Sequence, residues 1–219
     1  MTQSAKHGEV MFSRSEIEAV AAKAARGVGF DWGLAEEAGM AARRLVEAGL
    51  PGPELLLAYL EGARGSAPEI AINHWRAPLG GILCPLLTGA ALCDHAAILA
   101  EAHDLRLHCL SHPALIVPFV AQVAARQKRV LRVTWTGAGV ITTPGALHPV
   151  LVDALATTEA VEVTISILTT AVPATKPLQT GRRVSQDVWR RLDALAIATT
   201  VPATGSSRAG AGAGNLDND

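Results

Sequence analysis

The chain has 219 residues, of which 49% are hydrophobic and 18% are charged. This composition is typical of a globular protein with one full core or two small ones, and it excludes a disordered chain. With 19 basic and 20 acidic residues, the formal net charge is -1. The chain therefore lacks the surplus of Lys and Arg that nucleic-acid binding requires.

The N-terminal third is predicted to be helical, after a loose leader over residues 1–12. Ser13 and Glu16 form a capping-box pattern in front of a first helix. Asp31 is a suitable N-cap for a second helix that ends at Gly49. Small residues in this helix would let another helix approach closely: Ala35, Ala38, Gly39 and Ala42. Pro53 suits the first turn of a third helix that ends near residue 64.

The middle of the chain changes from helices to strands. Glycines and prolines mark residues 62–81 as a loop region, and residues 79–93 are expected to be buried core, too short to span a membrane. Helices are predicted over about 91–102 and 118–126, with a strand over 105–109 between them. Residues 130–135 and 139–142 resemble the two strands of a hairpin. Residues 161–167 form the clearest strand pattern, and Ser185 is placed to cap a last helix.

These elements predict an α+β fold: a helical unit followed by a small, mainly antiparallel sheet with helices on one face. We expect a single α+β domain over residues 13–204. It comprises a helical sub-unit at 13–64 and a mixed part at 75–204, followed by a Gly/Ala/acidic tail at 205–219.

Cysteine usage favours a reduced, cytoplasmic protein. The three cysteines are Cys84, Cys93 and Cys109, and no Cys-x-x-Cys occurs. An odd count without that motif predicts neither a disulfide framework nor a zinc knuckle. The run Val10-Met11-Phe12 is too short for the apolar region of a signal peptide.

Segments at both ends resemble a family of uncharacterised proteobacterial proteins of about 200 residues, classed as a domain of unknown function. The opening segments are Ser13-Arg14-Ser15-Glu16, Lys23-Ala24-Ala25-Arg26-Gly27 and Trp32-Gly33-Leu34-Ala35-Glu36-Glu37. The closing segments are Val201-Pro202-Ala203-Thr204, Ser207-Arg208, Gly210-Ala211-Gly212-Ala213-Gly214 and Asp217-Asn218-Asp219. The resemblance implies no known reaction or cofactor, but it implies that the tail has a role. A departure is Thr199-Thr200, where the family pattern implies an aromatic residue before Val201.

The tail has little apolar surface to bury, so it is either disordered or held by specific partners. If it docks on the body, Gly allows close approach of backbone, and Asp217 and Asp219 need basic partners. Arginine pairs well with carboxylates, and the candidates are Arg26, Arg182, Arg183 and Arg208. A hard cation held by the tail acids is an alternative.

Other candidates for chemistry are isolated. Glu36 lies one helical turn from Trp32, so it is a candidate acid–base residue, or else a first-turn acid favoured by the helix dipole. Cys109 is a weak candidate nucleophile beside His108 and His112. His95 and His103 are too far apart on a helix for one metal ion, and no metal site is predicted.

The polar stretch from Thr175 to Arg183 is either a solvated connector or a loop that binds an anionic metabolite. Its basic members are Lys176, Arg182 and Arg183. Two functions follow from these features. The first is a protein or enzyme subunit that binds a carboxylate metabolite where this loop, Trp32, Glu36 and the tail converge. The second is a non-catalytic interaction protein, in which the small-residue helix and the tail mediate homo-oligomerisation.

Overall fold

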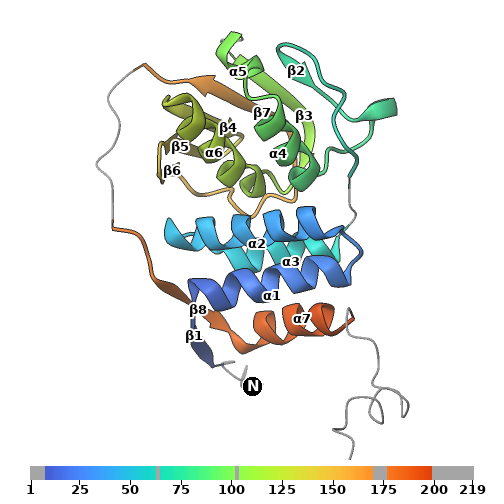
Figure 1. Cartoon of the computed structure of the whole chain (residues 1–219), viewed down its shortest axis with the longest axis vertical. Coiled ribbons are helices and arrows are strands. Elements are labelled where there is room, and N and C mark those ends of the chain that lie inside the picture. The colour runs from blue at the N-terminus through green and yellow to red at the C-terminus, as the bar shows by residue number, and fades with distance from the viewer. Residues whose placement is uncertain (1–7, 63–64, 102–103, 170–176, 199–219) are drawn as a thin grey trace, which may run out of the picture.

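The computed structural model describes residues 8–62, 65–101, 104–169 and 177–198. It contains both helices and a mixed sheet, as the α+β prediction requires (Figure 1). The helices are α1 (Arg14–Gly27), α2 (Trp32–Glu47), α3 (Gly52–Glu61), α4 (Pro85–Asp94), α5 (Ile98–Glu101), α6 (Val117–Gln127) and α7 (Gln186–Ile197), with short 3-10 turns at Pro78–Gly80 and Pro113–Ile116. The strands are β1 (Glu9–Ser13), β2 (His74–Trp75), β3 (Asp104–Ser111), β4 (Leu131–Trp135), β5 (Ala138–Thr143), β6 (Ala146–Leu151), β7 (Glu159–Ile167) and β8 (Gly181–Ser185).

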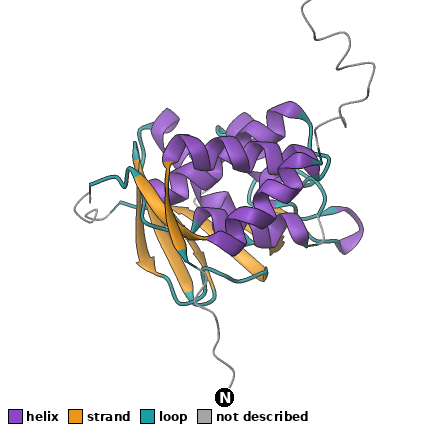
Figure 2. Ribbon diagram, turned by 90° about the horizontal axis from the view of Figure 1, so that it is seen from below, coloured by secondary structure: helices purple, strands orange, loops and turns teal. Residues whose placement is uncertain are grey.

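The larger sheet has six strands within the described residues, in the order β2-β3-β7-β4-β5-β6. Its pairs are antiparallel except for β2–β3. Alternate residues such as Leu107 and Val163, which are paired, point into the core, whereas Arg106 and Glu162 lie on the solvent side. Figure 2 shows the helices gathered on one side of the strands. The predicted hairpin is β4–β5.

The helical layer is formed by α1, α2, α3 and α7 (Figure 1). The first two helices pack through the small-residue stripe: a Cβ added at Gly39 would lie 2.7 Å from the Glu18 carbonyl oxygen of α1. The small residues of α2 were expected to allow close approach of another helix, and that helix is α1 of the same chain. The layer also contains α7, which the predicted sub-unit at 13–64 did not include.

Two local predictions are wrong. Residues 9–12 of the expected loose leader, together with Ser13, form β1, which pairs with β8, and Phe12 stacks on Trp189 with ring centroids 3.5 Å apart. The helix expected at about 91–102 begins earlier, at Pro85, because proline is favoured in a first turn. Cys84 caps it by accepting a hydrogen bond from the Leu87 N–H, and the helix ends at Asp94. The tail at 205–219 lies outside the described residues.

Candidate functional site

The connection between α1 and α2 brings the C-terminal end of one helix beside the N-terminal end of the next. The capping box at Ser13 begins α1, as predicted, with the Glu16 side chain accepting a hydrogen bond from the Ser13 N–H at 2.8 Å. Asp31 begins α2 by accepting the Leu34 N–H at 2.8 Å. The two caps fix the first residue of each helix. The start of each helix in turn determines which of its side chains face the other helix.

A pocket of about 330 Å³ opens between these two helices near their connection. We call it the Trp32 pocket. Its lining residues are Ala19, Ala22, Lys23, Arg26, Trp32, Ala35 and Glu36. The alanines give an apolar floor, and Lys23, Arg26 and Glu36 give the pocket a formal charge of +1.

Trp32 is 71% exposed, which is unusual for so large an apolar side chain. The Arg26 guanidinium carbon lies 4.7 Å from the centre of its ring, in a cation–π arrangement. The Nη1 group of Arg26 also donates a hydrogen bond to the Phe30 carbonyl oxygen. These two contacts hold the guanidinium at the mouth of the pocket. Within the described chain, neither Arg26 nor Lys23 forms an ion pair.

The structure does not bring the predicted basic loop to Trp32 and Glu36. The Nε group of Arg182 lies 3.5 Å from a carboxylate oxygen of Glu54, and its Nη1 donates to the Gly49 carbonyl oxygen. Gly49 follows the C-terminal end of α2, whereas Trp32 is its first residue. A helix of 16 residues is about 24 Å long. Pairing of β8 with β1 thus holds Arg182 at the opposite end of the helix from Trp32, so these two predicted site residues do not meet.

The remaining predicted ligand residues lie elsewhere. Arg183 is exposed on β8, opposite Met11. Lys176, Arg208, Asp217 and Asp219 lie outside the described residues.

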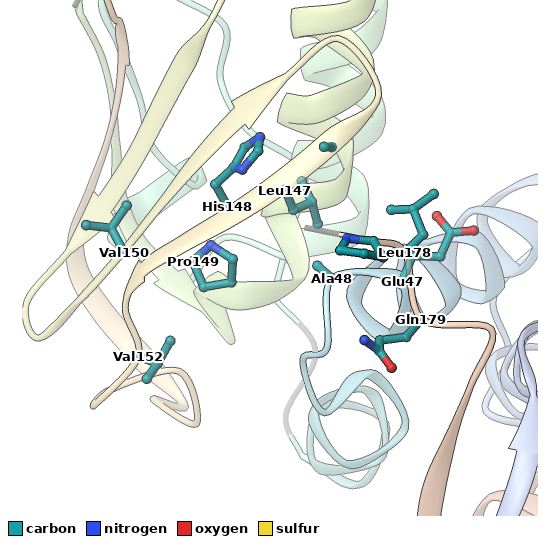
Figure 3. Close-up of a pocket in the computed structure, with 11 residues that line it drawn as sticks. Glu47, Ala48, Leu147, His148, Pro149, Val150, Val152, Leu178 and Gln179 are labelled. Carbon is teal, nitrogen blue, oxygen red and sulfur yellow. The ribbon is translucent and has the colours of Figure 1, made fainter. Parts of the chain in front are cut away.

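A second pocket, of about 360 Å³, lies where the end of α2 faces β6 and residues 177–179 (Figure 3). Figure 3 shows Leu178 beside Glu47, Leu147 on the side of β6 that faces them, and the His148 ring on the other side of that strand. The carboxylate of Glu47 is already neutralised by Arg14 and Arg43, at 3.2 and 2.8 Å. The walls are otherwise mostly apolar, and none of the described residues that line this pocket is a Lys or Arg. It is thus a poorer match for an anion than the Trp32 pocket.

The two candidate catalytic residues have no organised partners in the described part of the chain. Glu36 is exposed at the edge of the Trp32 pocket, so its acid–base role stays a prediction. Cys109 is half-buried and has a φ of 52°. His108 lies on the outer face of the sheet opposite Glu162, whereas His112 directly follows β3 and is buried. Neither ring makes a hydrogen bond to the Cys109 thiol among the described residues.

A buried polar cluster joins the helical layer to the sheet, and the sequence reasoning missed it. The Tyr59 hydroxyl and the Cys84 sulfur lie 2.9 Å apart, and the His112 ring packs edge-on to Tyr59. Both ring nitrogens of His112 lack a hydrogen-bond partner among the described residues. Burial lowers the pKa of His112, because a charged imidazole would lose its hydration. No local sequence signal connects these residues, which come from a helix, a loop and a strand end.

The sequence analysis also did not identify Lys23 and Arg26 as residues that line the Trp32 pocket. Arg26 was expected only as a partner for the tail acids, and Lys23 was not considered. Their spacing of three residues places both on one face of α1, which is the signal that could have identified them.

Two further findings concern metal sites and membrane-spanning helices. Among the described residues, no three His, Cys, Asp or Glu side chains are placed to share a metal ion. His103, one of the histidines considered above, lies outside that part of the chain. None of the described helices has both the length and the apolar character needed to cross a membrane.

Comparison with known proteins supports the resemblance inferred from the opening segments. Residues 12–80 match the family described as "Protein of unknown function (DUF3726)". The match covers the α1–α2 pair and hence the Trp32 pocket. The closing motifs lie beyond it. No curated protein matches the chain.

Among solved structures, the fold is similar to that of a dehydrogenase from Sinorhizobium meliloti. The TM-score is 0.53 at 12% identity, over 86% of this chain and 100% of that one. Malate dehydrogenase from Entamoeba histolytica gives a TM-score of 0.41 at 9% identity, over 62% of this chain and 44% of that one. Malate dehydrogenase from Pyrococcus horikoshii gives 0.43 at 8% identity, over 70% and 51%. The chain thus spans less than half of the Entamoeba enzyme, and of these three structures the Sinorhizobium one supports the likeness in fold.

Proposed function

We propose that the protein binds a small anionic metabolite, of the carboxylate class, in the Trp32 pocket. The observation that carries the proposal is that two cations, Lys23 and Arg26, line this pocket. Neither of them has an acidic ion-pair partner in the described chain. Arginine is the side chain best suited to a carboxylate, because its planar fork can donate two hydrogen bonds.

The other lining groups fit the same class of ligand. The exposed face of Trp32 and the alanine floor offer apolar contact for a short carbon skeleton. The volume of about 330 Å³ lies at the lower end of the range for small-molecule sites. A fold shared with a protein named as a dehydrogenase is compatible with metabolite binding, though it supplies no residue roles.

The test is a calorimetric titration with malonate, succinate and glutarate, with the uncharged diamide of succinate as the negative control. A hydrogen bond to a charged group contributes about 1.5–3 kcal/mol. Replacing Arg26 by Ala is therefore expected to weaken dicarboxylate binding by about tenfold to hundredfold. Lys23→Ala is expected to have a smaller effect, since lysine acts as a single point charge.

A matched control is Arg106→Ala, which removes the same type of side chain from the solvent face of the sheet, where it is 61% exposed. Dicarboxylate affinity is expected to survive this change. Binding that Arg26→Ala leaves intact would contradict the proposal. So would the absence of binding by every carboxylate tested.

A second candidate function is self-association, and one surface favours it. Strand β6 is the edge of the larger sheet in the described structure; Val150 within it is 62% exposed, and Val152 directly after it is 49% exposed. An exposed edge of this kind can pair with another chain. Sedimentation analysis of Val150→Lys tests it. A dimer that this substitution dissociates supports the interaction protein, and a wild-type monomer at all concentrations contradicts it.

A further inference from the structure

The C-terminal turn of α7 lies directly against the C-terminal turn of α1. A Cβ added at Gly27 would lie 1.7 Å from the Leu195 carbonyl oxygen, so the two backbones are in contact there. The last described residue, Ala198, donates its N–H to that same oxygen at 3.2 Å. Gly27 immediately follows Arg26. The chain therefore leaves the described structure beside the Trp32 pocket, at the end of the molecule where α1 connects to α2 (Figure 1).

The 21 residues that follow, 199–219, complement this pocket in charge. From Ala209 onward they contain two acids, Asp217 and Asp219, and no basic residue. Leu216 precedes the first acid. One apolar side chain followed by a carboxylate matches a pocket that has an alanine floor and Lys23 and Arg26 at its rim.

We infer that the acidic end of the chain's own C-terminal segment, Leu216–Asp219, docks in the Trp32 pocket and competes there with the anionic ligand. The inference rests on the proposed function in so far as both use Lys23 and Arg26. It adds a form of regulation, because a metabolite must displace the segment before it can bind.

The length of the segment permits this contact. Asp217 is 19 residues beyond Ala198, a stretch that can extend to about 60 Å. Lys23 is four residues before Gly27, or about 6 Å along α1. A Gly-rich linker of this length has a root-mean-square span of about 25 Å, which gives a local concentration in the millimolar range. A segment whose dissociation constant for the pocket is about tenfold below this local concentration, or about 0.1 mM, would occupy the pocket for most of the time.

The experiment uses full-length protein with Asp217→Asn and Asp219→Asn combined, compared with wild type by acrylamide quenching of Trp32. The Trp32 signal is obtained as the difference from matched Trp32→Phe proteins. The double substitution is expected to raise the quenching constant of Trp32 about twofold or more, because the segment would leave the ring uncovered. The matched control is Asp153→Asn with Asp193→Asn, which removes two exposed acids outside the segment.

A peptide with the sequence of residues 209–219 then provides a test in trans. Added to the doubly substituted protein, it is expected to restore protection of Trp32, and to fail when Arg26 is replaced by Ala. Equal quenching of wild type and the double variant, together with no effect of the peptide, would overturn the inference.

Succinate titrations separate this inference from the proposed function. Competition predicts affinity about threefold to tenfold tighter for the doubly substituted protein. Peptide binding without any carboxylate binding would support docking and contradict the metabolite proposal. Equal succinate affinity in both proteins, with no peptide binding, would support the metabolite proposal and overturn docking.

Discussion

Replacing Gly27 by Ala tests the contact that places the end of α7 beside the Trp32 pocket. The added methyl group would lie 1.7 Å from the Leu195 carbonyl oxygen and 2.7 Å from the Leu195 carbonyl carbon. Both atoms belong to the backbone, so no side-chain rotation can relieve the overlap. The two helices must move apart by about 1.5–2 Å to restore an ordinary contact of about 3.5 Å.

Two opposing free-energy contributions determine how much Gly27→Ala changes the stability of the fold. Alanine is favoured over glycine inside a helix by about 1 kcal/mol, and by less in a last turn. Forcing a methyl group into a packed contact costs about 1–3 kcal/mol, and here the separation also loosens the buried side chain of Leu192. The expected net change is a loss of about 2 kcal/mol. For a chain of this size, that corresponds to a melting temperature lower by roughly 4–8 °C.

Urea and thermal unfolding measure this change, and Gly33→Ala is the matched control. Gly33 lies in the first turn of α2, where an added Cβ would have its nearest neighbour at 3.8 Å, an ordinary contact. The control is expected to be neutral or slightly stabilising. A Gly27→Ala protein as stable as wild type would refute the backbone contact between α1 and α7.

The other expected outcomes concern one cap and two buried groups. Asp31→Ala removes the N-cap of α2 and is expected to cost about 1 kcal/mol in urea unfolding, whereas Asp31→Asn should retain most of the stability. Burial lowers the pKa of His112 below its ordinary value of 6.5, so the unfolded chain binds more protons in the window below 6.5. Stability is therefore expected to fall as the pH drops through that window, and a His112→Asn protein with the same pH dependence would contradict this reading. Burial raises the pKa of the Cys93 thiol from 9.0 to about 11, so this thiol should react with a disulfide reagent at pH 8 about a hundredfold more slowly than it does in urea. Equal rates would show that the site is open to solvent.

The local elements were predictable because their signals are local. The caps at Ser13, Asp31 and Ser185 are side-chain hydrogen bonds within three residues, and all three are present. The alternation of residues in β3 and β7 likewise reports which face is buried. These signals were enough to predict an α+β fold with a mainly antiparallel sheet.

The long-range pairings could not be predicted in this way. Strand β1 pairs with β8 at the opposite end of the sequence, and its residues carry no mark of that partner. The same pairing moves Arg182 away from Trp32. The site had been predicted by grouping residues of complementary charge, and its members Trp32 and Arg182 lie at opposite ends of α2. Trp32 and Glu36, one helical turn apart in the sequence, do line one pocket together with Lys23 and Arg26. Their roles in binding and catalysis stay predictions.

The central claim is that the Trp32 pocket binds a carboxylate, and the indole N–H resonances of the protein test it most directly. Trp75 and Trp135 donate their indole protons to the carbonyl oxygens of Ala71 and Ala154, so they serve as internal references. During titration with succinate, we expect a saturable shift of the Trp32 resonance while the two references stay fixed, and Arg26→Ala is expected to raise the succinate concentration at half-saturation by about tenfold or more. A Trp32 resonance that does not move up to about 10 mM succinate, well above the usual range of Michaelis constants, would contradict the account.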